Sequence, residues 1–407
     1  MTFPEKPLAE LCEKPQYGFT ARSSPDGPGP LYLRVTDVRQ SHLDWESVPR
    51  CETTEVDKEK YLLRAGDIVI ARSGSVGFAK QIRPDAPAAI FASYLVRFRP
   101  RPELVDPRYL GEIVESEAFR QDVERRATGA AQPNANARVL GATRIPVPPL
   151  KVQRKIAAVL AAYDELIENN LRRIEILEEM AQAVYREWFV NFRYPGHESV
   201  PLVDSPLGPI PDGWGVSTLG DVSIVVMGQS PKSEFYNDTG DGLPFHQGVS
   251  NFGSHFPVHS KYCTVETRVA EPDDLLVSVR APVGRINVAD TRLVIGRGLA
   301  AVRPVDPFVG FHYRQLRYVF REEDAMGGGT IYKAITKGDL LGIQWLVPPA
   351  EIKAAFDAFE RPMFKLISNL TQQNRNLRST RDLLLPKLVS GEIDVSDLDI
   401  DTDWLVA

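Results

Sequence analysis

The chain carries one sequence pattern twice, and the second version lies about 200 residues after the first. The repeated motifs include Val147-Pro148-Pro149 and Val347-Pro348-Pro349, Arg99-Pro100 and Arg303-Pro304, and Gly66-Asp67-Ile68-Val69 and Asp273-Asp274-Leu275-Leu276. In both versions a long amphipathic segment follows Pro-Pro. A period of this length indicates two whole domains rather than a solenoid of short repeats. We therefore expect two similar but non-identical domains with a pseudo-two-fold relation.

Composition and charge narrow the class of protein. The 407 residues allow two or three domains, each with its own hydrophobic core. The sequence shows neither an apolar signal segment nor the run of about 18 apolar residues that a membrane span needs. Three scattered cysteines form no C-x-x-C pair, which predicts a reduced cytoplasmic compartment without a zinc or disulfide framework. The net charge of −6 argues against a simple polybasic nucleic-acid binder, so any DNA contact must come from local patches or from a partner.

The order of the predicted elements defines the domain type. In residues 1–150, short β-like runs alternate with Pro and Gly, and a helical stretch at 107–126 precedes a Gly/Ala/Asn-rich loop at 129–137. The second half repeats this order, with a helical run at 308–324 before a Gly-rich loop at 327–330. This order predicts an α+β domain that is used twice.

Two long helices are expected after the Pro-Pro motifs. Apolar residues recur at alternating steps of three and four in 151–192, which is the pattern of a coiled-coil helix. The spacing returns less regularly in 351–391, where Pro362 should kink the helix or delay its start. The predicted fold is therefore α+β, with two domains joined by two long antiparallel coiled-coil helices.

A polar residue interrupts the apolar positions of each helix. If the helices pack antiparallel with Ile156 opposite Leu388, Asn170 falls opposite Asn374. A buried pair of Asn side chains would fix the register of the two helices at some cost in stability. We therefore expect Asn170 and Asn374 to specify the helix–helix register.

Composition also divides the chain into segments. A Pro/Gly-rich stretch separates the halves, and the last residues contain several Asp and no basic residue. The expected segments are a first domain at 1–150, a spacer helix at 151–192, a linker at 193–212, a second domain at 213–350, a second spacer helix at 351–391 and an acidic tail at 392–407.

The sequence lacks the motifs of common catalytic sites. The segment from Ser73 to Gly77 resembles a phosphate-binding loop but lacks the Lys-Ser/Thr that would follow. The Pro-Pro motifs lack the flanking polar and aromatic residues of aminomethyltransferases. His255 and His259 have a possible metal-ligand spacing, but Pro257 lies between them, so surface histidines are the favoured interpretation. We therefore expect neither a catalytic residue nor a bound metal.

Several motifs together resemble one known family. They are Leu384–Ile393 (LLPKLVSGEI), Trp188–Phe192 (WFVNF), Ile210–Trp214 (IPDGW) followed by Leu219–Val222 (LGDV), and the segments Tyr17–Thr20 and Tyr32–Asp37. These residues resemble the specificity subunits of type I restriction–modification systems, and the resemblance covers essentially the whole chain. Two features depart from the family pattern: Pro362 interrupts the second helix, and the first domain lacks the IPxGW opening.

The resemblance implies a non-catalytic subunit that reads double-stranded DNA. Each domain would be a target-recognition domain for one half of a bipartite site, and the helices would dock two methyltransferase subunits. Those partners would bind S-adenosylmethionine, while ATP and Mg²⁺ would serve restriction subunits, whose presence the sequence leaves open. The chain itself would hold no cofactor. A methylation-only or phage-defence system could use the same subunit.

Side-chain chemistry and the repeat indicate candidate DNA contacts. Base edges and phosphates call for Arg, Lys, Asn, Gln, small hydroxyls and backbone N–H groups on loops. In the first domain the candidates are Tyr17, Thr20, Arg72, Ser73, Gly74, Ser75, Gln132, Asn134, Asn136 and Arg138. In the second domain they are Gln229, Ser230, His246, Gln247, Arg280, Arg285, Thr330, Tyr332 and Lys333. For each of them, a solvated surface residue or a turn former is the alternative interpretation.

Two other functions are alternatives to DNA recognition. A coiled-coil scaffold whose domains bind protein would suit the acidic net charge. An enzyme with a cryptic site would contradict the absence of catalytic motifs. Sequence-specific retention of DNA separates the specificity subunit from the scaffold, and methyl transfer by the isolated chain would support the enzyme.

Overall fold

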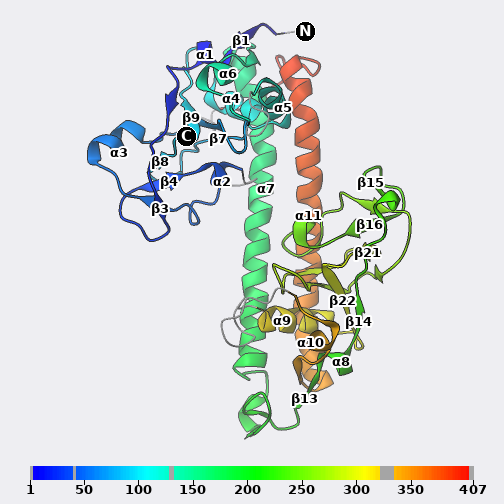
Figure 1. Cartoon of the computed structure of the whole chain (residues 1–407). Coiled ribbons are helices and arrows are strands. Elements are labelled where there is room, and N and C mark those ends of the chain that lie inside the picture. Colours follow the sequence, from blue (N-terminus) through cyan, green and yellow to red (C-terminus); the bar gives the residue numbers. More distant parts are fainter. Residues whose placement is uncertain (1–2, 40–42, 128–132, 321–333, 403–407) are drawn as a thin grey trace. The chain divides into compact units, whose positions relative to one another are not determined.

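The computed structural model describes residues 3–39, 43–127, 133–320 and 334–402. The chain forms two compact units, Met1–Asn169 with Asn374–Ala407 and Asn170–Gln373. We call them the first and the second unit. Each unit contains one mixed domain of helices and sheets and a half of each of two long helices (Figure 1). The predicted α+β class, with an internal repeat and two long helices, is confirmed.

The two long helices follow the two Pro-Pro motifs. Helix α7 spans Leu150–Tyr185 and continues into a π-helical turn at Arg186–Val190, and helix α11 spans Ala350–Ser390. The expected delay at Pro362 is wrong, because α11 begins at Ala350 and runs through this proline. A proline inside a helix removes one backbone hydrogen bond, which buried side chains on both sides can offset. Phe356 and Ile367 are such residues, and both are fully buried.

Within the first unit the two helices run antiparallel. Asn374 Nδ2 donates a hydrogen bond to the carbonyl oxygen of Ile167 at 3.3 Å, and Arg381 forms an ion pair with Asp164. The residue number rises along one helix as it falls along the other. These contacts lie close to the register that sets Ile156 opposite Leu388.

The second unit shows the same direction of packing. The rings of Trp188 and Phe356 lie 6.0 Å apart, and Ile174 and Leu370 belong to one buried apolar cluster. Asn170 and Asn374 are both buried, but they belong to different units, so their pairing stays a prediction.

The first domain contains three antiparallel or mixed sheets. The strand orders are β1-β10, β2-β9-β6-β7 and β3-β5-β4-β8, and β4 and β8 pair in parallel. Strands are β1 (Glu5–Pro7), β2 (Gln16–Tyr17), β3 (Ser23–Ser24), β4 (Leu31–Leu33), β5 (Arg50–Cys51), β6 (Ile68–Ala71), β7 (Ala79–Gln81), β8 (Ala89–Phe91), β9 (Leu95–Phe98) and β10 (Arg144–Pro146). Helices are α1 (Leu8–Leu11), α2 (Val35–Val38), α3 (Glu55–Tyr61), α4 (Pro107–Val114), α5 (Glu117–Arg126) and α6 (Ala137–Gly141).

The second domain repeats this plan, and one of its sheets has an additional strand. The orders β13-β23, β14-β22-β19-β20 and β15-β17-β16-β21-β18 correspond to the three sheets of the first domain, and β11-β12 is an additional pair. Its strands are β11 (Leu202–Val203), β12 (Ile210–Pro211), β13 (Gly215–Thr218), β14 (Ser223–Met227), β15 (Tyr236–Asn237), β16 (Leu243–His246), β17 (Tyr262–Cys263), β18 (Val269–Ala270), β19 (Leu275–Ser278), β20 (Ile286–Val288), β21 (Leu293–Ile295), β22 (Leu299–Pro304) and β23 (Gln344–Val347). Its helices are α8 (Leu219–Val222), α9 (Val309–Val319) and α10 (Lys337–Leu341), with 3₁₀ turns at His197–Ser199, Ser233–Phe235 and Val249–Asn251.

One buried ion pair recurs in both domains. Arg99 contacts both carboxylate oxygens of Asp67, with distances of 2.7 and 2.9 Å, and Arg303 contacts both of Asp274 at 2.7 Å. Both aspartates are 1% exposed. Two-point contacts between Arg and carboxylate fix geometry as well as charge. The repeated motifs of the sequence therefore hold the turn before β6 and before β19 in one conformation.

That turn contains a testable difference between the domains. The backbone has a positive φ at this position in both domains, +84° at Gly66 and +70° at its counterpart Asp273. A side chain disfavours this conformation, so it is strained at Asp273 but not at Gly66. We expect Asp273→Gly to raise the free energy of unfolding by about 0.5–1 kcal/mol, because the strain is relieved. Urea unfolding would measure the change. Gly66→Asp should destabilise the first unit by a similar amount, and a loss of stability in Asp273→Gly would contradict the account.

Buried charges attach the second domain to its helices. Arg314 on α9 contacts Glu178 on α7 at 2.6 Å and Glu360 on α11 at 2.5 Å. His255 contacts Glu178 at 2.7 Å, and Arg317 also pairs with this carboxylate. Burial opposes the ionisation of Glu178, but hydrogen bonds from His255 and Arg314 hold its pKa well below the usual range. Arg314 thus links one domain to both long helices.

A second charge cluster attaches the first domain. Arg83 lies 4.0 Å from Glu112 on α4 and 3.9 Å from Asp164 on α7, and Arg381 on α11 pairs with Asp164. Burial, together with the nearby Asp164 carboxylate, raises the pKa of Glu112 to about 8. This cluster therefore contains a carboxyl group that resists ionisation.

The acidic C-terminal segment packs on the first unit as far as the structure describes it. Val395 is 3% exposed and belongs to the same apolar cluster as Leu388. Lys155 on α7 donates hydrogen bonds to the carbonyl oxygens of Ser396 and Leu398 at 2.6 and 2.7 Å. The residues up to 402 thus contribute to the packing of this unit.

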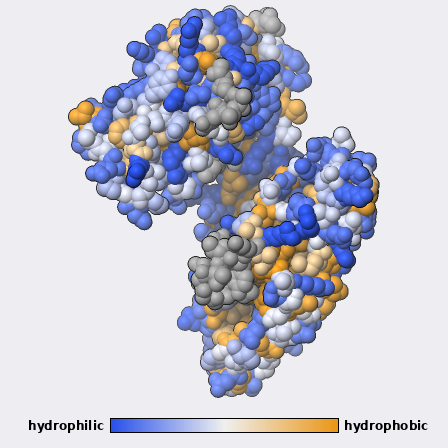
Figure 2. All heavy atoms as spheres, in the orientation of Figure 1, coloured by the Kyte–Doolittle hydropathy of each residue, from blue (hydrophilic) through white to orange (hydrophobic). Residues whose placement is uncertain are grey.

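The described helices include none that is long and apolar enough to cross a membrane. On the face shown in Figure 2, hydrophilic residues predominate on the first unit, and hydrophobic residues are more frequent on the second.

Candidate nucleic-acid interface

Two loops that the repeat singled out meet in the first domain. The loop after β6 contains Arg72 and Ser73, and Ser73 forms an isolated antiparallel bridge with Asn134. The backbone N–H of Ala135 donates to the carbonyl oxygen of Arg72 at 2.8 Å. Residues about 60 positions apart in the sequence therefore form one surface.

Aromatic side chains flank the cation of this surface. The guanidinium carbon of Arg72 lies 5.2 Å from the ring centre of Tyr17 and 5.8 Å from that of Tyr94. Its Nε donates to the carbonyl oxygen of Ser93 at 3.0 Å, and the Tyr17 hydroxyl accepts from the Ala137 N–H at 3.0 Å. Tyr94 is 56% exposed. A cation held between aromatic rings is oriented for contact with bases or phosphates.

The other first-domain candidates differ in exposure. Thr20, Gly74, Asn136 and Arg138 are exposed, Ser75 and Asn134 are half-buried, and Gln132 lies outside the described residues. Ser73 is buried, at 6% exposure, so its side chain supports the loop rather than the outer surface. The Asn136 side-chain oxygen caps helix α6 by accepting the N–H groups of Arg138 and Val139. A side chain engaged in this way has a structural role at the helix start.

The corresponding loops of the second domain meet in the same manner. Arg280 forms an isolated antiparallel bridge with Ala334, and the Ile335 N–H donates to the carbonyl oxygen of Val279 at 2.9 Å. Arg280 and Arg285 are exposed. The candidates Thr330, Tyr332 and Lys333 lie outside the described residues.

Three further candidates of the second domain gather around a residue that the sequence analysis missed. The Ser230 hydroxyl donates to the side-chain oxygen of Gln247 at 2.8 Å and accepts from the backbone N and the Nε of Arg297. Gln229, Gln247 and Arg297 are exposed. In the sequence Arg297 lies between two glycines, a pattern that indicates a turn but not a role for the arginine.

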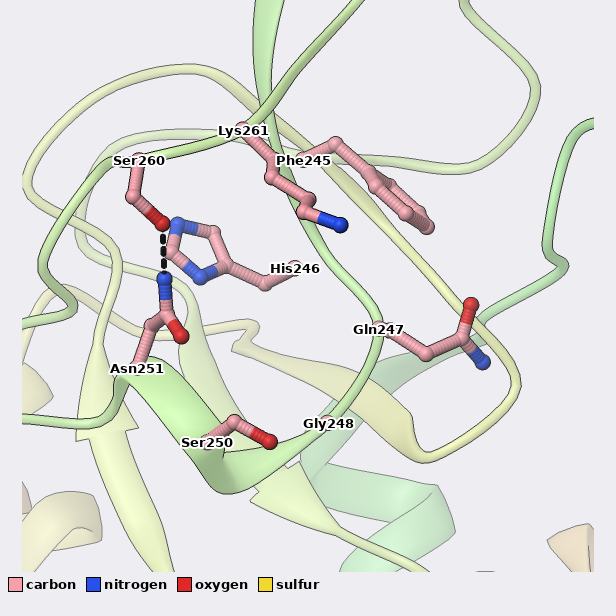
Figure 3. Close-up of a pocket in the computed structure, with 8 residues that line it drawn as sticks. All are labelled: Phe245, His246, Gln247, Gly248, Ser250, Asn251, Ser260 and Lys261. Atoms are coloured by element: carbon pink, nitrogen blue, oxygen red, sulfur yellow. Dashed lines mark hydrogen bonds between the residues drawn. The ribbon is translucent and has the colours of Figure 1, made fainter. Parts of the chain in front are cut away.

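His246 is not on the surface, which corrects the expectation from the sequence. It is 2% exposed, and its ring contacts His259, which in turn contacts Asp290, each at 3.0 Å. Burial, together with the neighbouring His259, lowers the pKa of His246 to about 4. Figure 3 shows the His246 ring and the Gln247 side chain on opposite sides of the chain. Successive side chains of a strand alternate in this way, so His246 supports the loop while Gln247 faces outward.

The His246 side chain also lines a cavity of about 160 Å³ with Asn251, Ser260 and Lys261 (Figure 3). The parts of the chain that the structure describes contain no group of three His, Cys, Asp or Glu side chains arranged to hold a metal ion.

Comparisons with known proteins agree with the duplicated architecture. A family model described as type I restriction modification DNA specificity domain matches residues 6–179. A protein of Methanocaldococcus jannaschii, described as the MjaX specificity subunit of a type I restriction enzyme, is 31% identical over 403 residues, which cover 95% of this chain and 93% of that protein. The HindI specificity subunit of Haemophilus influenzae is 22% identical, over 90% of this chain and 95% of that protein.

A solved structure supports the fold. The S subunit of a type I restriction–modification system from M. genitalium has a TM-score of 0.57 at 16% identity, over 95% of this chain and 96% of that chain. That likeness concerns the fold, whereas the 31% identity over nearly the whole chain shows the family. The protein belongs to the specificity subunits of type I restriction–modification systems, the non-catalytic subunits that give these complexes their DNA sequence specificity.

Proposed function

We propose that each of the two domains reads one half of a bipartite DNA site and that helices α7 and α11 set the distance between them. The first recognition domain comprises residues 1–150 and the second residues 213–350. The observation that carries the proposal is the matched loop pairing, Ser73 with Asn134 and Arg280 with Ala334. The backbone arrangement is shared while the exposed side chains differ, so the two surfaces suit two different half-sites.

The proposal extends to the partners. The long helices dock two methyltransferase subunits, which carry S-adenosylmethionine, and restriction subunits supply ATP- and Mg²⁺-dependent cleavage in the cytoplasm. This chain contributes DNA recognition and holds no cofactor. Its net charge of −6 favours tight DNA binding only within the assembled complex, where partner subunits add positive charge.

Paired substitutions test the independence of the two domains. We expect Arg72→Ala with Ser75→Ala to relax only one half of the methylated motif, and Arg280→Ala with Arg285→Ala to relax only the other. Each lost base contact reduces discrimination by about 1–3 kcal/mol. The measurement is single-molecule mapping of methylated adenine in cells that co-express each variant with its methyltransferase subunit.

A matched control is Arg125→Ala, because this arginine of α5 is 75% exposed and pairs with Asp122. It should leave the motif unchanged. Equal relaxation of both halves by either pair would contradict independent domains, and a stable complex without any bipartite motif would support a scaffold instead.

A further inference from the structure

Three segments of the second domain are packed backbone against backbone beside the recognition loops. They are residues 228–230 after β14, Gln247 and Gly248 after β16, and residues 296–298 between β21 and β22. A Cβ atom on Gly228 would collide with the carbonyl oxygen of Gly296, and one on Gly298 would lie 2.6 Å from that of Gln247. Glycine is therefore required at these contacts. The packing places the exposed Arg297 between Ser230 and Gln247.

The side-chain hydrogen bonds of this cluster form a chain in which Arg297 donates to Ser230 and Ser230 donates to Gln247. Arg297 donates from its backbone N and its Nε to the Ser230 oxygen, at 3.2 and 3.4 Å. An arginine has no acceptor, so the hydroxyl proton must point elsewhere, and it points to the Gln247 side-chain oxygen at 2.8 Å. This assignment also fixes the orientation of the Gln247 amide, because its oxygen faces the Ser230 hydroxyl and its nitrogen points away.

The side-chain nitrogens that remain available at this surface are donors. They are the two terminal nitrogens of Arg297 and the amide nitrogen of Gln247, which have no hydrogen-bond partner among the described residues. Both side chains are exposed. A surface of N–H groups fits a ligand that presents adjacent acceptors. In the major groove guanine offers two, N7 and O6, whereas adenine offers one acceptor beside a donor.

We propose that Arg297, assisted by Gln247 and positioned by Ser230, reads a guanine in the half-site of the second domain. This inference rests on the proposed function, since it assumes that this domain contacts base edges. Arg297 acts through the planar two-point contact that arginine makes with N7 and O6. Ser230 is a positioning residue, because it holds the guanidinium through Nε and does not itself face the base.

The first domain has the same backbone at this place but different side chains. The Leu95 N–H donates to Ala92 at 2.8 Å, and the Leu299 N–H donates to Gly296 at 3.0 Å. This match places Ser93 where the second domain has Arg297. The donor cluster is therefore confined to one domain, and the effect of Arg297 should be confined to one half-site.

The test begins with the full complex. The motif methylated by the wild-type chain with its methyltransferase subunit is compared with the motifs given by Arg297→Met and Arg297→Lys. With either variant, the methylated motif should tolerate any base at one position of one half-site where the wild-type motif requires guanine. Methionine loses both the charge and the two-point contact, and lysine keeps the charge but loses the two-point contact. The matched control is Arg292→Met, an exposed arginine of the same domain that pairs with Glu266, and it should leave the motif unchanged.

A chemical substitution in the DNA tests which atom of the base Arg297 contacts. A duplex carrying 7-deazaguanine at the relaxed position lacks the N7 acceptor, and we expect it to bind the wild-type complex about 10- to 100-fold more weakly. The Arg297→Met complex should bind both duplexes equally. Ser230→Ala should partly relax the requirement for guanine at the same position of the motif. Ser230→Thr keeps the hydroxyl group and should retain this requirement, which separates positioning of Arg297 from a general loss of folding.

Three outcomes would overturn the inference. They are a second-domain half-site without a G·C pair, an unchanged motif in Arg297→Met, and a uniform loss of affinity with a reduced salt dependence, which would indicate a phosphate contact. A wild-type complex that methylates without any bipartite motif would instead overturn the proposed function.

Discussion

Replacing Arg314 by Met should destabilise the second unit more than any other single change considered for this protein. Arg314 is 3% exposed and neutralises two carboxylates, Glu178 and Glu360, of which Glu360 is fully buried. Removing one partner of a buried ion pair leaves an uncompensated charge, which costs about 3–5 kcal/mol. We therefore expect urea unfolding, followed by tryptophan fluorescence, to show a loss of about this size in Arg314→Met.

A neighbouring arginine provides the control. Arg317 contacts the same Glu178, but its side chain is 42% exposed, so Arg317→Met should cost about 1 kcal/mol or less. Adding Glu360→Leu to Arg314→Met should recover part of the loss, since an apolar pair of similar volume needs no neutralising charge. Equal effects of Arg314→Met and Arg317→Met would show that burial does not decide the strength of this network.

The repeat in the sequence predicted which loops of the two domains correspond, but not that the two loops of one domain meet. The structure shows this meeting in both domains, where Ser73 pairs with Asn134 and Arg280 with Ala334. Such pairings follow from backbone geometry, which similar motifs preserve. The buried pairs Asp67–Arg99 and Asp274–Arg303 show the same principle. Residues that fix backbone geometry recur, and their recurrence is visible in one sequence.

The positions of individual side chains could not be predicted in this way. His246 is buried because β16 lies in the middle of a five-stranded sheet, and neither its residue type nor its neighbours reveal that. Arg297 was missed because two flanking glycines indicate only a turn. Pro362 was assigned too much weight, because packing of both flanks holds α11 together. In each case tertiary contacts far apart in the sequence decide the outcome.

The two domains thus combine a shared backbone with independent surfaces. Ser93 and Arg297 occupy equivalent backbone positions, yet the first domain surrounds its arginine with tyrosines while the second orients its arginine through a serine. A backbone fixed by buried Asp–Arg pairs and glycine contacts tolerates such exchange. This explains how one repeated fold can carry two different DNA specificities, as the proposed function requires.

Replacing Glu112 by Gln should stabilise the first unit, and by an amount that depends on pH. Burial and the Asp164 carboxylate raise the pKa of Glu112 to about 8 in the folded chain, above its ordinary value of 4.5. The folded state therefore binds this proton more tightly than the unfolded state. The resulting stability is fully present below pH 4.5 and is lost as the pH rises from 4.5 to about 8. An uncharged amide of the same shape avoids this loss.

The expected gain for Glu112→Gln is roughly 2–4 kcal/mol at pH 8.5 and falls towards zero near pH 5. Unfolding in urea across this pH range measures it. The matched control is Glu10→Gln, an exposed carboxyl of the same unit, which should change stability little at any pH. Arg83 pairs with Glu112 at 4.0 Å and works against the effect. A loss of stability in Glu112→Gln at pH 8.5 would mean that this ion pair, rather than desolvation, dominates the cluster, and a gain independent of pH would exclude ionisation as its cause.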